Sequence, residues 1–305
     1  MDTKVSFVAA ELQQSGLLSC SGDDARAYLH AQLTNDIAGL AAHEARIAGW
    51  CSAKGRLLAT FLVVARGGEV LLQVPREIAP SVAKRLSMFI LRAKAKLVDA
   101  SDAWAQFGFW GAAAAEQLAA LGLALPQGPM RTTHAEQGIV VQVAAQRYWV
   151  LVPAAHRAPF AAMASETGEG AWALEEIRAG RPQVVLATQD QFVPQMVNLE
   201  RLGAVDFKKG CYPGQEIVAR TQYRGVLKRR MVHARVAAQA AAGDDLFADA
   251  LPGQASGAVV NAAALPDGGS ELLAVAQISV LEGAQPMRLR SADGPVLELL
   301  PLPYA

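Results

Sequence analysis

The chain has 305 residues, of which 52% are hydrophobic and 18% are charged. This length and composition predict a globular protein of two or three domains with a large apolar core. The 28 basic and 28 acidic residues give zero net charge, which excludes a bulk field that would draw the whole molecule to nucleic acid or to an anionic membrane. Any site for an anion must therefore be local.

In chain order, apolar periodicity and turn residues predict a mixture of helices and strands over the first 170 residues. The predicted elements are a helix at Asp23–Leu33, strands at Glu44–Ala53, Arg56–Ala65 and Glu69–Pro75, a helix at Glu77–Leu91, a helix at Ala112–Leu123, strands at Gly138–Ala144 and Arg147–Val152, and a helix at Arg157–Glu166. Short turns between neighbouring strands favour antiparallel hairpins. Because no strict βαβ alternation occurs, we predict an α+β fold.

The pattern changes near Val232, where helical signals fade and short apolar runs alternate with Gly, Pro and Asp. Strands are predicted there at Gly257–Asn261, Leu272–Val280, Met287–Leu289 and Val296–Leu299. Several short strands in succession are typical of a small all-β domain. We therefore predict two parts, an α+β region at residues 1–231 and a β-domain at residues 232–305.

The cysteines Cys20, Cys51 and Cys211 are odd in number and lack CxxC spacing, and the five histidines are scattered. This pattern predicts neither a disulfide framework nor a metal site. Reduced thiols favour a cytoplasmic protein. Asp2 and Lys4 interrupt the apolar core that a signal peptide needs, and we expect no membrane-spanning segment because no stretch of about 20 residues is strongly apolar.

The sequence lacks the motifs GxGxxG, GxxxxGK[ST], GxSxG and HExxH. It therefore gives no support for a dinucleotide fold, a P-loop nucleotide site, a serine hydrolase of the nucleophile-elbow type or a zinc protease.

The segment 206–230 carries seven basic and two acidic residues, a local net charge of +5 in a neutral chain. Such a concentration of cations favours a bound anion, although a solvated basic surface is the simpler interpretation. Pro213 suits the first turn of a helix and Gly225 its end, so we predict a helix at 213–223. On this helix Glu216, Arg220 and Arg224 share one face, either as a row facing a ligand or as a surface ion pair.

Cys211 then precedes a helix N-terminus and follows Lys208 and Lys209. Positive charge at both places favours a thiolate over a thiol, which predicts a reactive cysteine. The alternative is that Cys211 is a small residue within a tight turn.

The run Lys-Lys-Gly-Cys-Tyr-Pro-Gly-Gln-Glu-Ile-Val-Ala-Arg at 208–220, followed by Arg224-Gly225, closely resembles the signature of YgfZ-type folate-binding proteins, which are relatives of the glycine-cleavage aminomethyltransferases. The resemblance extends to Gln191–Gln195, to Asn198–Glu200, to Leu33–Asp36 and to Cys51–Arg56. It therefore touches most of the first 230 residues.

This resemblance implies an aminomethyltransferase-like α+β fold, in which two mixed antiparallel lobes and a small C-terminal β-barrel surround a central folate site. It implies tetrahydrofolate or a derivative as the cofactor. It also implies a role in assembling or repairing iron–sulfur enzymes, including one that modifies tRNA, with iron–sulfur client or assembly proteins as partners. Direct binding of nucleic acid and of membranes is not expected.

The residues present suit a folate, which offers pterin N–H donors, a flat ring system and a tail of carboxylates. The predicted folate-binding residues are Asn198, Glu200, Tyr212, Gln215, Glu216, Arg220, Arg224, Lys228 and Arg229. Among them, the carboxylate or amide groups suit the pterin, Tyr212 (or Tyr223 or Trp50) suits the ring wall, and the cations suit the tail. Cys211 and Lys209 are the predicted reactive pair.

Arg178 and Asp36 bear on the choice between possible functions. Arg178 stands where the aminomethyltransferases carry a folate-contacting glutamate, so either the pterin is held differently or Arg178 points away. Asp36 is a candidate for proton transfer to a one-carbon unit, or a residue that bonds nearby backbone amides. The alternative functions are a folate-dependent aminomethyltransferase or demethylase, and an RNA-binding module that uses segment 206–230.

Overall fold

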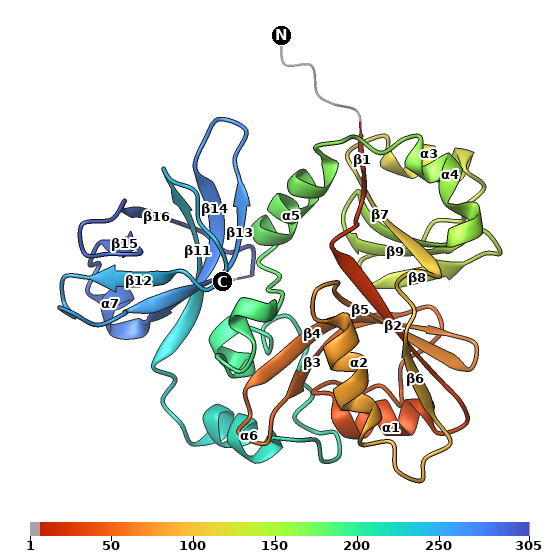
Figure 1. The fold of residues 1–305 in the computed structure, drawn as a ribbon, viewed down its shortest axis with the longest axis horizontal. Coiled ribbons are helices and arrows are strands. Elements are labelled where there is room, and N and C mark those ends of the chain that lie inside the picture. The colour runs from red at the N-terminus through yellow and green to blue at the C-terminus, as the bar shows by residue number, and fades with distance from the viewer. Residues whose placement is uncertain (1–6, 305) are drawn as a thin grey trace. The chain divides into compact units, whose positions relative to one another are not determined.

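The computed structural model describes residues 7–304, and Asp2 and Lys4 lie outside them. The chain forms two compact units. Within the described range, unit 1 contains residues 7–30, 36–47 and 61–172, and unit 2 contains residues 31–35, 48–60 and 173–304. Both units mix helices with antiparallel sheets (Figure 1), which confirms the predicted α+β class.

One antiparallel sheet in unit 1 has the strand order β1-β7-β10-β9-β8. Its strands are β1 (Val8–Glu11), β7 (Trp104–Trp110), β8 (Arg131–His134), β9 (Ile139–Ala144) and β10 (Arg147–Pro153). Alternate residues of β9 and β10 pack into two different apolar clusters, for example Val141 and Trp149 in one and Val140 and Val150 in the other. Period-two alternation therefore buries both faces, and helices α3 (Ala114–Ala120) and α4 (Arg157–Ala161) cover one of them.

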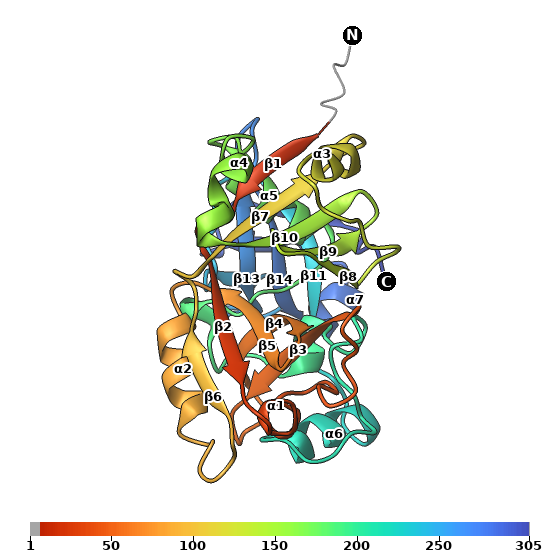
Figure 2. The same cartoon turned by 90° about the vertical axis from the view of Figure 1, so that its right-hand side faces the viewer.

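The second sheet has the order β3-β4-β5-β2-β6. Its strands are β2 (Ser15–Ser21), β3 (Ala45–Cys51), β4 (Leu57–Arg66), β5 (Glu69–Pro75) and β6 (Lys96–Asp99). Helix α1 (Ala25–Gln32) follows β2, and helix α2 (Ala79–Ser87) packs against β2 and β6 (Figure 2). The strands predicted at 44–53, 56–65 and 69–75 are confirmed, and β3 and β4 contribute residues to both units.

The four helices predicted over the first 170 residues exist but are shorter than the periodicity suggests. Helix α2 ends at Ser87 rather than Leu91, because residues 88–94 form turns whose amides bond to nearby carbonyls and to Asp24. Helix α4 ends at Ala161 because the amide of Ser165 donates to the carbonyl of Ala9 in β1. Further helical elements are η1 (Ala154–His156), α5 (Gly168–Arg178), η2 (Leu186–Thr188), η3 (Pro194–Val197) and α6 (Gln215–Tyr223).

The C-terminal part of unit 2 is a six-stranded antiparallel sheet of order β15-β12-β13-β14-β11-β16. Its strands are β11 (Arg229–Val236), β12 (Asp245–Ala248), β13 (Gly257–Ala264), β14 (Ser270–Gln277), β15 (Met287–Leu289) and β16 (Leu297–Leu300). A bridge between Arg288 and Val296 joins β15 to the residue before β16, so the two edge strands meet and the sheet curls into a small barrel. The predicted division at residue 231 falls inside β11 and remains a prediction.

The strand predicted at 272–280 is partly wrong. Strand β14 ends at Gln277, and helix α7 (Ile278–Glu282) takes the rest of the same apolar run. Val280 of α7 is buried in the barrel core. A continuous apolar run does not distinguish a strand from a short buried helix, and here the choice depends on tertiary packing.

An ion pair with a buried carboxylate joins helix α5 to the C-terminal sheet within unit 2. Both oxygens of Glu271 in β14 accept from Arg178, at 3.0 and 2.9 Å, and His233 of β11 lies 3.2 Å from the same carboxylate. The Glu271 side chain is only 8% exposed. The hydrogen bonds from Arg178, which outweigh the opposing effect of burial, hold the pKa of Glu271 below its usual range.

We expect Glu271→Gln to lower the free energy of unfolding at pH 7 by about 2 kcal/mol, because the buried carboxylate of Glu271 loses its charge-assisted hydrogen bonds from Arg178. The pKa of Glu271 is lower in the folded state than in the unfolded state, so its contribution is present above about pH 4.3 and is lost as the pH falls through the folded pKa.

Urea unfolding of wild type and variant at pH 7 and at pH 3.5 tests this expectation. Glu298→Gln, which removes the same charge from an exposed position in β16, is the matched control. An equal deficit at both pH values would contradict the electrostatic account of Glu271.

Candidate functional site

Segments that are far apart in the sequence meet in unit 2, and we call them the motif cluster: residues 33–35, 51–56, 190–200 and 203–224. Two left-handed glycines form its centre. Gly214, at φ +77, is the N-cap of α6, and Gly55, at φ +70, lies in the turn between β3 and β4. A Cβ on Gly214 would come within 2.4 Å of the Ser52 carbonyl oxygen and 2.6 Å of the Gly55 Cα. The two turns therefore touch backbone to backbone, which only glycine permits.

Residues 33–35 attach to the segment that precedes α6. The hydroxyl of Thr34 donates to the carbonyl of Ala204 at 2.7 Å, and the amide of Asn35 donates to the carbonyl of Gly203 at 2.8 Å. The side chains of Thr34 and Asn35 are buried. These residues act as structural ties that fix the course of the chain before Lys208.

Residues 190–195 connect the β3–β4 turn to α6. The hydroxyl of Ser52 donates to Asp190 at 2.8 Å, and the backbone amide of Leu57 donates to the carbonyl of Phe192 at 2.8 Å. The amide of Gln195 donates to the carbonyl of Val218 in α6 at 2.7 Å, at a buried position. The motifs at 51–56, 191–195 and 208–220 are thus one structural group.

The two carboxylate oxygens of Glu200 differ in their hydrogen bonding. Its Oε1 accepts from Arg230 at 2.8 Å, and the same guanidinium nitrogen donates to Oδ1 of Asn198 at 2.8 Å. Asn198 is fully buried in a left-handed conformation, at φ 59, and donates to the carbonyl of Met231. Oε2 of Glu200 is buried and has no hydrogen-bond partner among the described residues. A buried carboxylate oxygen left in this way is costly, so it is available for an N–H donor from a ligand.

Arg178 is paired with residues outside this group. Its guanidinium donates to Glu271 and lies 3.4 Å from Glu175, so its positive charge is neutralised within the protein. Two residues later, Gly180 adopts φ +63, and a Cβ there would clash with the ring of Tyr304 at 2.6 Å. The Tyr304 hydroxyl donates to the Gly180 carbonyl at 2.6 Å.

Tyr212 and Lys209 lie together at the turn that leads into α6. Tyr212 is 7% exposed, and burial raises the pKa of its phenol, with a smaller effect from Cys51. Nζ of Lys209 donates to the carbonyl of Leu33 at 2.5 Å and lies 5.0 Å from the centre of the Tyr212 ring. The Lys209 ammonium is therefore already engaged by the protein.

Cys211 lies between these two residues and is exposed, whereas Cys20 and Cys51 are buried. Helix α6 begins at Gln215, two residues later than predicted, so Cys211 precedes its first residue by four positions. Burial raises the pKa of Cys20 and of Cys51 to about 12. Of the three thiols, only Cys211 is accessible to a reagent in the folded protein.

Four of the predicted folate-binding residues form an exposed cationic row at and beyond α6. They are Arg220, Arg224, Lys228 and Arg229, and within residues 7–304 none of them has an ion pair or a side-chain hydrogen bond. Glu216 is also exposed and makes no pair with Arg220. The simpler interpretation of this helix face as a surface ion pair is therefore not what the structure has. Gln215 is the first residue of α6 and is partly buried.

Sequence reasoning did not assign roles to Arg230 and Asp190. Arg230 belongs to the basic segment, but its neighbours did not distinguish it from Arg229, and only the fold turns it inward to Glu200. Asp190 accepts from Ser52 and has a left-handed φ of 58. Because Asp190 lies in an irregular segment, no pattern in the sequence indicated a role for it.

Asp36 does not join the motif cluster. Its carboxylate lies in unit 1, 3.0 Å from His30 and 2.9 Å from Arg46, and accepts from the amide of Gly39 at 3.0 Å. Burial opposes ionisation, but the Gly39 amide and Arg46 together lower the pKa of Asp36. A carboxylate held ionised in this way suits a structural role better than proton transfer.

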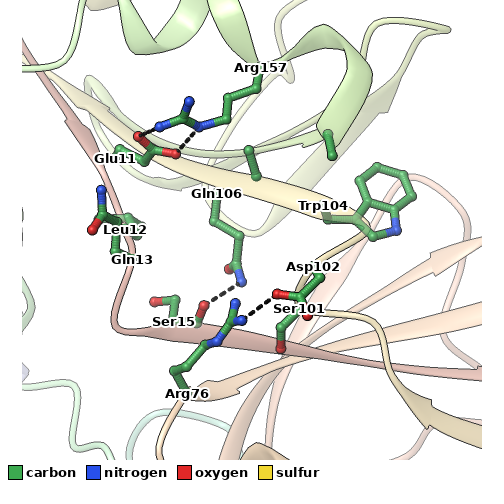
Figure 3. Close-up of a pocket in the computed structure, with 12 residues that line it drawn as sticks. Glu11, Leu12, Gln13, Ser15, Arg76, Ser101, Asp102, Trp104, Gln106 and Arg157 are labelled. Atoms are coloured by element: carbon green, nitrogen blue, oxygen red, sulfur yellow. Dashed lines mark hydrogen bonds and ion pairs between the residues drawn. The ribbon is translucent and has the colours of Figure 1, made fainter.

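A cavity of about 310 Å³ lies in unit 1 (Figure 3). Two ion pairs flank it: Arg157 with Glu11, at 2.6 and 2.7 Å, and Arg76 with Asp102, at 2.5 Å. The Gln106 amide donates across it to the Ser15 carbonyl. Because these charges already neutralise one another, the cavity presents no unsatisfied group to a ligand, and none of the predicted site residues lines it.

Within residues 7–304, no group of three or more His, Cys, Asp or Glu side chains could hold a metal ion. In the same range, no helix has the length and apolar character needed to cross a membrane.

Comparison with known proteins agrees with these motifs. The chain is 34% identical over 300 residues to the tRNA-modifying protein YgfZ of Edwardsiella ictaluri, covering 94% of this chain and 89% of that protein. It is 30% identical to the YgfZ of Klebsiella pneumoniae, covering 96% and 92%. No family model matches. The fold is similar to that of the glycine cleavage system aminomethyltransferase T from Bartonella henselae, with a TM-score of 0.78, 14% identity, and coverage of 99% of this chain and 87% of that one. The aminomethyltransferase-like fold is therefore confirmed, and the chain belongs to the YgfZ family.

Proposed function

We propose that this protein binds tetrahydrofolate or a derivative at the motif cluster and acts as an accessory factor for iron–sulfur enzymes, including one that modifies tRNA. The observation that carries the folate proposal is a complementary pair of features in unit 2. A buried carboxylate oxygen of Glu200 lacks a hydrogen-bond partner among the described residues, and four exposed cations lack ion pairs. A folate has N–H donors at one end and carboxylates at the other, so it offers a partner for each feature.

The pterin end would be bound by the acceptors near Arg230. The partnerless Oε2 of Glu200 would accept from a pterin N–H, while Arg230 and the buried Asn198 fix the position of the carboxylate. The partly buried Gln215 at the start of α6 offers an amide for the remaining polar edge. Tyr212, held by its contact with Lys209, would supply a flat wall for the ring.

The glutamate tail would be bound by the cationic row. Arg220 lies in the last turn of α6 and Arg224 is its C-cap, and Lys228 and Arg229 follow at the start of β11. Arginine side chains at this spacing suit successive carboxylates of a polyglutamate chain. Glu216 at the other end of the helix would face the neutral part of the ligand.

The iron–sulfur part of the proposal depends on family membership and on Cys211. Relatives carry the name tRNA-modifying protein, and the exposed thiol lies next to the tyrosine wall that we assign to the folate. An accessible thiol beside a bound reduced cofactor suits redox chemistry or contact with a partner protein. The unpaired cysteines are consistent with the reducing cytoplasm.

The two alternatives have less support. Aminomethyl transfer is disfavoured because Arg178 occupies the position of the transferase glutamate and is paired with Glu271. RNA binding by the cationic row would depend on phosphates and would therefore weaken steeply with salt. A salt titration of folate and of RNA binding separates these interpretations.

We expect Arg220→Ala combined with Arg224→Ala to weaken binding of a pentaglutamyl tetrahydrofolate by about 3- to 10-fold, as exposed ion pairs would. Binding of the monoglutamate should weaken less, because it has fewer carboxylates. Isothermal titration calorimetry with both ligands measures the difference.

The matched control is Lys84→Ala combined with Lys96→Ala, which removes two exposed positive charges from unit 1. If this control weakens the pentaglutamate equally, the effect reflects net charge alone. Equal losses for both ligands in the α6 variant would argue against recognition of the tail.

We expect iodoacetamide at pH 7 to alkylate Cys211 at least about ten times faster than Cys20 or Cys51, because the two buried thiols are inaccessible and their pKa values are raised to about 12. Peptide mass spectrometry of the quenched reaction gives all three rates in one sample. The assignment of Cys211 as the reactive thiol fails if it is the slowest.

We expect Cys211→Ala to retain the thermal unfolding midpoint and the folate affinity of the wild type, because the side chain is exposed. In a strain that lacks the chromosomal gene, it should fail to restore the product of an iron–sulfur tRNA-modifying enzyme, measured by mass spectrometry of tRNA nucleosides. Full restoration would contradict a chemical role for this thiol.

A further inference from the structure

An exposed apolar patch lies on unit 1 at the end of helix α2. Met88, Phe89 and Leu91 are 61%, 50% and 89% exposed, and Val98 on the edge strand β6 is 38% exposed. Figures 1 and 2 show the connection from α2 to β6 projecting beyond both elements at the periphery of this unit. Large apolar side chains gathered on a surface in this way are typical of an interaction site.

The connection is held in place by hydrogen bonds and is not a loose loop. The amide of Phe89 donates to Leu86 and the amide of Ala93 to Ile90, at 2.9 and 2.8 Å. The amide of Lys94 donates to the carboxylate of Asp24 at 2.7 Å, and the amide of Asp24 donates back to the carbonyl of Lys94 at 3.1 Å. The backbone is therefore fixed with its apolar side chains turned outward, so a partner would not have to order it.

The backbone conformation of Leu91 also points to an interaction site. Its φ is +45, a left-handed conformation that is unfavourable for a residue with a Cβ. The fold gains no buried contact from it, since the side chain is the most exposed of the patch. Strain combined with exposure of an apolar residue points to a role outside the folding of this chain.

The border of the patch is mainly basic. Segment 81–96 contains no acidic residue and five basic ones, Lys84, Arg85, Arg92, Lys94 and Lys96, all exposed. We propose that the patch docks a partner protein that presents an apolar groove bordered by carboxylates. Phe89 and Leu91 would enter the groove, and the basic border would meet the carboxylates and direct the encounter.

The charges around the apolar patch favour a protein partner over an anionic bilayer. Asp23 lies 3.9 Å from the ammonium of Lys94, Asp24 holds the backbone of the same residue, and Asp99 is exposed at the end of β6. A uniformly negative lipid surface would repel these three carboxylates, which offset most of the attraction of the basic border. A protein surface can place its charges to match both signs.

The proposal does not depend on folate binding, because the patch shares no residue with the motif cluster. To test it, a benzophenone amino acid replaces Leu91 in the full-length protein, and in a control it replaces Val296, which is 49% exposed. Irradiation of living cells should give one discrete cross-linked protein at position 91 and not at position 296. No product at position 91 beyond the control overturns the proposal, and so does cross-linking to a second copy of this chain.

The cross-linked protein is then purified and its affinity for the full-length chain is measured by calorimetry. Phe89→Asp combined with Leu91→Asp should weaken binding at least about tenfold, and Lys84→Glu combined with Lys96→Glu should weaken it at low salt and have less effect at high salt. Val296→Asp is the matched control and should leave the affinity unchanged. Unchanged binding by the first two variants overturns the proposal.

Two further measurements distinguish a protein partner from a bilayer and exclude unfolding of the variants. Wild type should not sediment with vesicles that contain 30% phosphatidylglycerol, and sedimentation that the Phe89 and Leu91 substitutions abolish would identify a bilayer instead. The thermal unfolding midpoints of all variants should match the wild type, because every substituted side chain is exposed.

Discussion

The contact between Gly55 and Gly214 is the constraint on which the rest of the motif cluster depends. Each glycine has a positive φ, and the two backbones approach too closely for any side chain. This contact fixes the start of α6 against the β3–β4 turn, and the ties from residues 33–35 and 192–195 then fix the segments on either side. Most polar side chains here hold these segments in position. The groups that remain unpaired are the ones that a ligand could use.

Charge is distributed in unit 2 in two different ways. Arg178 and His233 surround the buried carboxylate of Glu271, and the charges of Arg178 and Glu271 are paired. Such groups hold elements together without offering a site. Glu200 and the cationic row are the opposite case, because a buried acceptor and several exposed cations are left without partners among the described residues. The same contrast separates the cavity of unit 1, whose arginines are neutralised, from the motif cluster.

The apolar patch at the end of α2 belongs to a different kind of function. The groups of the motif cluster suit a small polar ligand. The patch suits a protein surface, because it has aromatic, aliphatic and basic side chains on a fixed backbone. The proposed function would need both, a site for the cofactor and a surface for the partner protein. We infer that the two tasks are assigned to separate surfaces of this chain.

The sequence by itself determined the α+β class, most of the strands, the end of α6 at Tyr223 and the family, because period-two alternation, turn residues and a specific local motif depend on neighbours along the chain. Only the tertiary structure decided that Arg230 faces Glu200 while Arg229 faces solvent, that Arg178 is neutralised by Glu271, and that an apolar run after Ala276 becomes helix α7. It also decided that residues 88–91, which continue the apolar periodicity of α2, leave the helix and expose Met88, Phe89 and Leu91. The physical reason is the same in each case: these outcomes depend on partners that are distant in the sequence, and no local pattern records which partner a side chain will meet.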